Sequence, residues 1–428
     1  MANSRGASQV KAFLRSLRSR NYRLFFSGQS VSLIGTWMQQ TAMSWLVYRL
    51  TGSAMFLGAI GFASQIPMFL LTPIAGVYAD RMNRYHLLIA TQFLAMLQAF
   101  ILAALTLTGT IKVWHLFVLT ALLGFVYAFD MPVRQSFVVE MLEDKTDLGN
   151  AIALNSFLFN GARLVGPSLA GILIGLSDEG ICFLINGLSF LAVLVALLLM
   201  KVKTRDLPPV GKSLMEELRN GLRYVAAFEP LKYILFNLGL MSFMGMPYTV
   251  LMPVFAKDIL KGGPETLGFL IASSGVGAII GAGFLASRQS ILGLDRLIGI
   301  TSALFGAGII LFGLSRSLPL SMLLIAVAGF GIMIQMVASN TIVQTIIEED
   351  MRGRVMSFYA MAFAGTMPFG SLYAGSLASA VGAPLTLTIS GIVCIAGALL
   401  FFFRLPQMRK VVRPIYHKLG IMPGHHLL

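Results

Sequence analysis

Two charged side chains fall inside apolar stretches of the sequence, where ionisable groups are rare and often functional. Of the 18 acidic residues, Asp130 alone lies well within an apolar run and outside any loop, and Pro132 and Arg134 follow it. A carboxylate in such a place needs a partner or water. Either it forms a structural ion pair, with Arg84 or Arg81 as candidate partners, or it is a proton-carrying carboxylate.

Arg163 is the second exception, near the middle of another apolar run. A buried guanidinium can hold helices together, or it can face a cavity and attract an anionic or catecholate-like group. The same run contains Gly161, Gly166, Pro167 and Gly171. Small residues let a neighbouring helix pack closely, and the proline bends its own helix.

Two long apolar runs are separated by the polar segment 76–85, which contains Asp80, Arg81 and Arg84. Charged groups between two membrane helices must lie at the bilayer surface. Gly76 allows close approach of a neighbouring backbone, and the four-residue spacing of Asp80 and Arg84 places both on one helical face. From the residues alone, the segment is an ordinary charged turn that follows the positive-inside rule.

Polar side chains are also scattered along the apolar runs, at the depth of the membrane. We expect the candidates for lining a cavity to be Trp37, Gln39, Gln40, Gln65, Asn155, Asn160, Gln335, Asn340 and Gln344. For each of them, hydrogen bonding or packing between helices is the competing interpretation.

Membrane helices must position these residues, because 57% of the 428 residues are hydrophobic and only 12% are charged. In soluble domains about a quarter of the residues are charged. A helix needs about 20 apolar residues to cross a bilayer, and the chain offers twelve such stretches. They cover residues 23–48, 54–79, 86–108, 112–136, 148–176, 180–201, 231–257, 264–288, 294–315, 319–346, 352–380 and 382–404. We therefore predict an all-α membrane protein with twelve transmembrane helices.

The distribution of Lys and Arg predicts the orientation of these helices. Of the 32 basic residues, 26 fall in the two tails and in the loops that follow even-numbered helices, and five fall in the other loops. Basic residues favour the cytoplasmic side, so both termini are expected in the cytoplasm of a multi-pass inner-membrane protein. Asp130 would then lie in the cytoplasmic half of its helix.

A long connection divides the predicted helices into two sets of six. It contains Pro208-Pro209 and a stretch in which Leu214, Leu218 and Leu222 recur every four residues, which predicts a short amphipathic helix on the membrane surface. The predicted domains are a cytoplasmic N-terminal tail (1–22), a six-helix bundle (23–201), a cytoplasmic linker with this helix (202–230), a second six-helix bundle (231–404) and a cytoplasmic C-terminal tail (405–428).

Several chemistries lack their sequence signatures. Cys182 and Cys394 are far apart in apolar stretches, and the five histidines show no metal-ligand spacing. Gly211-Lys212-Ser213 lacks the leading glycine of a phosphate-binding loop, and no nucleophile elbow is present. Basic residues are not interleaved with aromatic residues on a soluble face, as nucleic-acid binding would require. We expect no enzyme activity, no metal or other cofactor and no nucleic-acid partner.

Several motifs resemble those of the major facilitator transporters over residues 20–405. The spacing G-x-x-x-D-R-x-x-R from Gly76 to Arg84 looks like the family's loop between helices 2 and 3, and Gly166-Pro167-x-x-x-Gly171 resembles its helix 5 antiporter motif. Three further stretches look like the bacterial branch that contains the enterobactin exporter and related efflux carriers: 129–135, 150–156 together with Arg163-x-x-Gly166-Pro167, and 352–357. Two positions depart from the family pattern: Ala170 replaces a second glycine of helix 5, and Ser287 replaces the aspartate of the equivalent loop in the second half.

This resemblance implies two pseudo-symmetric six-helix bundles that rock about a central site, that is, alternating access. By this resemblance, the residues of a cytoplasmic gate would be Gly76, Asp80, Arg81, Arg84 and Asp130. Asp80, Arg81 and Arg84 would bind across the cytoplasmic interface near Arg352–Met356, and the departure at Ser287 makes the gate one-sided. The expected function is export of a siderophore or a drug-like molecule by proton antiport, with the substrate, protons and the lipid bilayer as partners of a monomer. The alternatives are an importer or facilitator of a small metabolite on the same fold and, more remotely, a membrane-embedded lipid-modifying enzyme.

Overall fold

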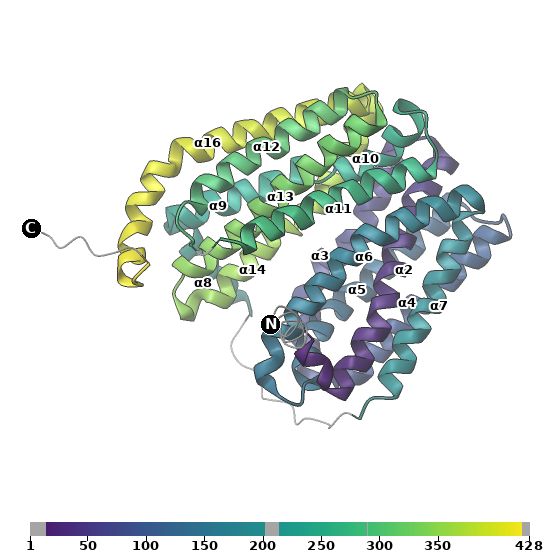
Figure 1. The fold of residues 1–428 in the computed structure, drawn as a ribbon, viewed down its shortest axis with the longest axis horizontal. Helices are drawn as coiled ribbons and strands as arrows, with labels where there is room; N and C mark the ends of the chain where they lie inside the picture. The colour runs from purple at the N-terminus through teal and green to yellow at the C-terminus, as the bar shows by residue number, and fades with distance from the viewer. Residues whose placement is uncertain (1–13, 202–213, 289, 422–428) are drawn as a thin grey trace, which may run out of the picture. The chain divides into compact units, whose positions relative to one another are not determined.

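The computed structural model describes residues 14–201, 214–288 and 290–421, apart from the side chains of residues 73, 74, 76–81, 214–218 and 220. This part of the chain is all-helical (Figure 1). It divides into two compact units. Unit 1 contains Met1–Pro209 and Pro253–Ala272, and unit 2 contains Val210–Met252 and Ser273–Leu428. A segment from the second half of the sequence, 253–272, therefore packs as part of unit 1.

The first half of the chain supplies most of unit 1. Its helices are η1 (Arg15–Arg18), α2 (Arg20–Thr51), α3 (Ala54–Arg81), α4 (Arg84–Leu107), α5 (Val113–Met141), η2 (Lys145–Asp147), α6 (Leu148–Leu176) and α7 (Glu179–Leu198). Local chemistry sets their ends: α2 stops at Gly52, whose φ of 59° suits glycine. Asn83 caps α4 by accepting hydrogen bonds from the backbone N–H groups of Tyr85 and His86.

Close helix packing holds unit 1 together. Helix α2 packs against α6 and α7, α3 packs against α5, and α4 packs against α7. Glycine permits this at Gly124 of α5, where an added Cβ would lie 2.2 Å from the carbonyl oxygen of Ser64. Near one end of the unit, the buried Tyr22, Phe25 and Phe137 belong to a hydrophobic core.

The remaining helices belong to the second half of the chain. They are α8 (Leu214–Ala227), α9 (Glu229–Leu240), the π-helical turn η3 (Met241–Gly245), α10 (Tyr248–Val254), the π-helical turn η4 (Phe255–Ile259), α11 (Pro264–Ala286), α12 (Leu294–Leu314), α13 (Leu318–Ile346), η5 (Glu349–Met351), α14 (Arg352–Phe363), α15 (Met367–Val381) and α16 (Ala383–Lys418). In unit 2, α12 packs against both α13 and α16. Helix α8 lies in the predicted linker, whose residues 202–213 are outside the described part of the chain.

Ten of the described helices are long and apolar enough to cross a membrane. Helix α2 has 32 residues but is not among them, because polar side chains such as Gln29, Gln39 and Gln40 lower its hydropathy. The count of twelve spans in two bundles of six remains a prediction.

The structure corrects two of the predicted helices. The helix expected over 352–380 is interrupted between Phe363 and Met367, just before Pro368, which cannot donate a backbone hydrogen bond. The last helix was expected to end near 404, where the sequence becomes basic, but α16 continues to Lys418. Basic residues do not end a helix, and Met408, Val412 and Tyr416 give this extension a buried apolar stripe.

Candidate functional site

Asp130 is fully buried and belongs to a polar cluster between α4 and α5. Its Oδ1 accepts hydrogen bonds from Thr91 Oγ1 at 3.0 Å and from Gln92 Nε2 at 2.7 Å. Its Oδ2 forms an ion pair with Arg134, one helical turn along α5, a partner that the sequence analysis did not name. Both carboxylate oxygens thus accept from donors, an arrangement that suits the ionised, acceptor-only form.

Arg84, a predicted partner of Asp130, forms an ion pair with Glu140 in the structure. Its Nη1 lies 2.8 Å from Glu140 Oε1, and both side chains are about one-fifth exposed. The side chains of the other predicted gate residues, Asp80 and Arg81, and position Gly76 of α3 lie outside the described set. The expected contact of the gate with the region of Arg352–Met356 remains a prediction.

Arg163 of α6 lies over the indole of Trp37 on α2. Its guanidinium carbon is 5.9 Å from the ring centroid, within range of a cation–π interaction. Phe159 packs edge-on against the same indole at 5.7 Å, so one cation and two aromatic rings form a cluster. Trp37 and Arg163 are half-buried in it, and Phe159 is exposed. Asn160, on the same stretch of α6, donates to the Ser156 carbonyl at 2.8 Å.

The predicted helix 5 is α6 in the structure, and the glycines of its motif have different surroundings. A Cβ at Gly166 would lie 2.6 Å from Trp37 Cβ, so this glycine allows α6 to approach α2 beside the aromatic cluster. A Cβ at Gly171 would lie 2.7 Å from the Pro264 carbonyl oxygen. At Gly161, in contrast, no described atom lies within 4 Å of an added Cβ. The motif therefore receives two neighbours within unit 1: α2 and the first turn of α11.

A second contact ties the segment 253–272 to the rest of unit 1. The hydroxyl of Tyr48, near the end of α2, donates a hydrogen bond to Asp258 Oδ2. The ammonium of Lys257 lies 5.7 Å from the centroid of the Tyr48 ring. We call Tyr48, Lys257 and Asp258 the clasp. Sequence reasoning missed the clasp, because 210 residues separate Tyr48 from Asp258.

Another ion pair lies near the same end of α2. Arg49 donates two hydrogen bonds of 2.8 Å to the carboxylate of Glu179, which is 2% exposed. Asp178 precedes it and caps α7 by accepting from the N–H of Gly180. A fork of two parallel bonds fixes the angle between the helix ends.

Several of the predicted lining residues lie within the helix packing instead. Gln39 is 4% exposed, donates to Gln98 at 3.0 Å and accepts from Asn186 at 2.8 Å. Asn155 accepts from the hydroxyl of Tyr22, and Gln335 is fully buried. These contacts fit the interhelical interpretation of the polar scatter.

The other predicted lining residues are more accessible. Gln40 and Gln344 are exposed, and Gln344 donates to Asn340 at 2.7 Å. Gln65 is partly exposed and donates to the Gly61 carbonyl in its own helix. Within the described residues, no group of three or more His, Cys, Asp or Glu side chains could hold a metal ion.

Comparison with known families gives a match over almost the whole chain. The family described as "Transmembrane secretion effector" matches residues 12–418. Among similar proteins, the staphyloferrin A transporter of Staphylococcus aureus is 26% identical, over 89% of this chain and 95% of its own. Macrolide efflux protein A of Streptococcus pyogenes is 24% identical over 88% and 95%, and the multidrug efflux pump Tap of Mycolicibacterium fortuitum is 24% identical over 86% and 92%.

Solved structures share the fold. A bacterial homologue of the human lysosomal transporter Spinster superimposes with a TM-score of 0.72 at 13% identity, covering 92% of this chain and 98% of that one. A POT family transporter in complex with a thioalcohol-conjugated peptide gives the same TM-score and identity, covering 91% and 96%.

Proposed function

The chain belongs to the transmembrane secretion effector family of the major facilitator transporters, and on this basis we propose that it exports a small siderophore or drug-like molecule by alternating access. It is a membrane transporter of the efflux type and not an enzyme. One observation carries the finer proposal: similar proteins, matched over at least 92% of their own length, are named for transport of staphyloferrin A or for efflux of macrolides and other drugs.

The Arg163 cluster is the proposed recognition element for the substrate. A guanidinium over an indole presents a positive charge beside an apolar, planar surface. Phe159, 42% exposed, extends this surface on α6. Such a cluster suits a molecule with an aromatic or other planar part and an anionic or catecholate-like group.

Alternating access requires the unit 1 contacts of the segment 253–272 to change during the cycle. The chain enters this segment at Met252–Pro253 and leaves it at Ala272–Ser273. Two π-helical turns, η3 and η4, lie before and after the entry point, and such turns mark places where a helix can bend. We therefore assign the clasp as one gate and the predicted loop 76–85 as the gate at the opposite, cytoplasmic end.

Proton antiport would supply the energy for export. One proton moving inward across 100 mV releases about 2.3 kcal/mol, which sustains a useful gradient of a neutral substrate. Asp130 is the proposed site of coupling, because its fully buried carboxylate would need to exchange Arg134 for a proton during the cycle. The same account places the protein in the bacterial inner membrane as a monomer with both termini in the cytoplasm.

Metabolite profiling of a deletion strain tests export. We expect one or more small molecules to accumulate inside the cells and to fall in the medium, and the intact gene to reverse both changes. Arg163→Gln should fail to restore export, whereas Arg163→Lys, which keeps the charge, should restore it in part. The opposite change, a compound that remains in the medium and is lost from the cells, would indicate an importer.

A further inference from the structure

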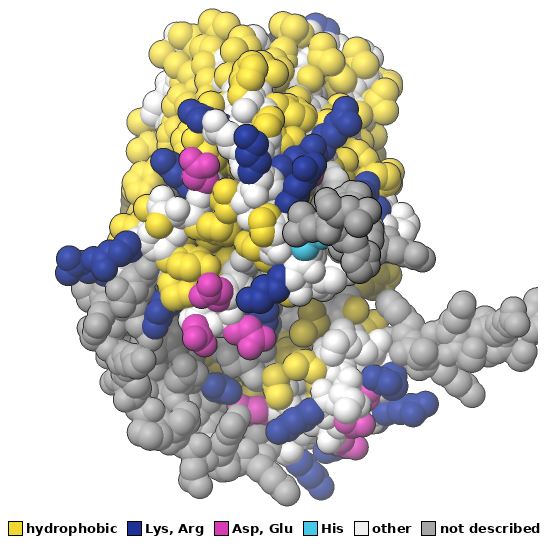
Figure 2. Space-filling view, turned by 90° about the vertical axis from the view of Figure 1, so that its left-hand side faces the viewer, with side chains coloured by type: hydrophobic (Ala, Val, Ile, Leu, Met, Phe, Trp, Pro, Cys, Tyr) yellow, Lys and Arg dark blue, Asp and Glu magenta, His cyan; other side chains and the backbone are white. Residues whose placement is uncertain are grey.

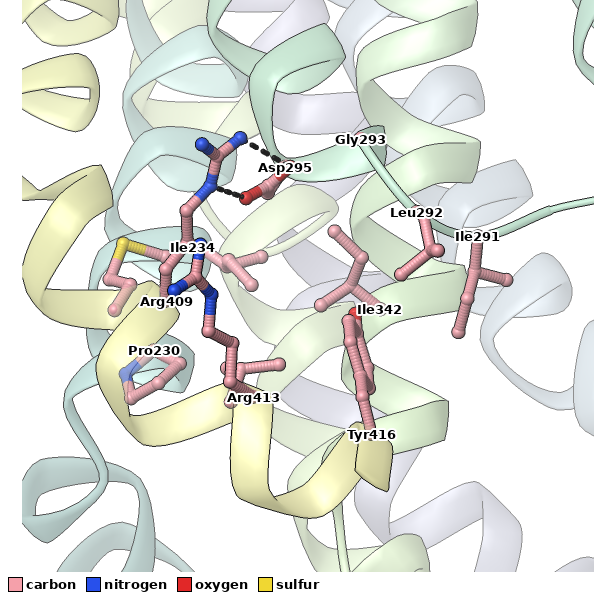
Figure 3. Close-up of a pocket in the computed structure, with 12 residues that line it drawn as sticks. Pro230, Ile234, Ile291, Leu292, Gly293, Asp295, Ile342, Arg409, Arg413 and Tyr416 are labelled. Carbon is pink, nitrogen blue, oxygen red and sulfur yellow. Dashed lines mark hydrogen bonds and ion pairs between the residues drawn. The ribbon is translucent and has the colours of Figure 1, made fainter. Parts of the chain in front are cut away.

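The C-terminal part of α16 forms one wall of a pocket in unit 2. The pocket has a volume of about 220 Å³. Figure 3 shows that its other walls come from Pro230 at the start of α9, the turn at Gly293, Asp295 at the start of α12, and Ile342 of α13. All of these elements belong to the same unit.

Helix α16 is longer than a membrane crossing requires. It has 36 residues, whereas about 20 residues span the hydrocarbon of a bilayer. Its final turns contain the exposed Lys410 and Arg413 and the buried Met408, Val412 and Tyr416. An amphipathic helix end with basic residues suits the headgroup region of a membrane. The face drawn in Figure 2 includes a zone where Lys and Arg side chains gather next to hydrophobic ones.

Two arginines line the pocket, and among the residues that the structure describes only Arg409 has a carboxylate partner. Arg409 binds Asp295 through Nε and Nη2, at 2.5 and 3.2 Å. Arg413 follows four residues later on the same helical face and extends in the same direction (Figure 3). Within the described residues, it makes no hydrogen bond or ion pair. The mouth of the pocket therefore carries one uncompensated positive charge.

The remaining lining is apolar and partly accessible. Ile291 and Leu292 are half-buried, and the pocket extends over the buried Ile342 and Val412. A small inorganic anion would gain nothing from this apolar lining. An amphiphile with an anionic head and a hydrocarbon chain would gain both from the arginine pair and from the aliphatic side chains.

We propose that this pocket binds an anionic phospholipid. Arg413 donates to the phosphodiester oxygens, Arg409 orients the headgroup from its pair with Asp295, and the first methylene groups of an acyl chain lie against Ile291 and Leu292. The site would attach α9, α12 and α16 to the membrane surface at one end of unit 2. The inference requires only the membrane setting of the chain and is independent of the direction or substrate of transport.

Lipid binding to the full-length protein in detergent, measured by native mass spectrometry, tests this inference. The protein is titrated with phosphatidylglycerol or, separately, with phosphatidylcholine. We expect phosphatidylglycerol to be retained preferentially, and Arg413→Gln to weaken its binding about tenfold, because a charge-assisted contact to phosphate is lost. Lys410→Gln is the matched control: it removes one positive charge from the neighbouring exposed turn but does not alter the pocket lining.

A second variant tests the apolar part of the site. Ile291→Trp leaves both arginines in place but narrows the space beside them, and it should also weaken phosphatidylglycerol binding. Equal effects of Arg413→Gln and Lys410→Gln would show general surface attraction and overturn the proposal. Equal retention of the two lipids would do the same, as would full displacement of phosphatidylglycerol by inorganic phosphate, which would indicate a site for a soluble anion.

Discussion

Removing one hydroxyl group should loosen the clasp. Tyr48→Phe deletes the donor to Asp258 but keeps the ring that lies beside the Lys257 ammonium. A hydrogen bond to a charged group contributes about 1.5–3 kcal/mol, and solvent exposure of one partner reduces this value. Tyr48 is buried, whereas Asp258 is exposed. We therefore expect a loss of about 1–1.4 kcal/mol, which favours the open form of the clasp by about five- to tenfold.

Cysteine labelling measures this opening. Thr266, in the first turn of α11, is 5% exposed, and Thr266→Cys changes its size little. The two native cysteines are fully buried, so they provide a low background. A membrane-impermeant maleimide should label Cys at position 266 five to ten times faster when Tyr48→Phe is also present, because opening of the segment 253–272 exposes this position.

A matched tyrosine serves as the control. The Tyr22 hydroxyl donates to the Ala151 carbonyl at 2.9 Å in a different part of unit 1. Tyr22→Phe removes a buried hydroxyl of the same kind and should leave the labelling rate unchanged. Unchanged labelling in Tyr48→Phe, or an equal rise in both variants, would refute the assignment of Tyr48 and Asp258 as a gate.

Three further changes test the packing and the charges of unit 1. Asp130→Asn should lower the free energy of unfolding by about 3 kcal/mol and abolish transport, because it leaves Arg134 without its carboxylate. Adding Arg134→Gln should recover much of the stability but not the transport. Thermal unfolding and uptake assays measure the two effects. Glu179→Gln should lower the unfolding temperature by a few degrees, because the two parallel hydrogen bonds from Arg49 to the carboxylate are lost. Asp178→Asn should have a smaller effect, because the Asp178 carboxylate lies 3.8 Å from Arg49. Gly124→Ala should destabilise the protein by about 2 kcal/mol or more in the same assay, whereas Gly161→Ala, which meets open space, should be neutral or slightly stabilising.

Much of the helical framework could be predicted from the sequence, because crossing a bilayer imposes a length and a composition on each helix. Asp130 and Arg163 stood out for a related reason: an ionisable group within an apolar run is costly and needs a partner. Both have partners in the structure, Arg134 for the first and Trp37 for the second. The spacing of Asp130 and Arg134 on one helix is a signal that could have identified the first pair from the sequence.

The remaining contacts depend on tertiary packing. Nothing near Gln39 in the sequence indicates that Gln98 and Asn186 will meet it, and nothing near Tyr48 indicates Asp258. The interruption before Pro368 had a local signal, since proline removes a backbone donor, but the apolar run conceals it. The extension of α16 beyond residue 404 was missed because a membrane span is predicted to end at the first basic residues, whereas the helix itself continues past them.

Proton movement in inside-out membrane vesicles tests the central claim most directly. Vesicles that contain the protein are energised to acidify their interior, and a panel of probes (a catechol siderophore, a macrolide and a cationic dye) is added in turn. We expect at least one probe to enter the vesicles and to release protons as it does so, and we expect Arg163→Gln to abolish both signals. Entry of a probe without proton release, or unaltered transport by the Arg163→Gln variant, would contradict proton-coupled export through this site.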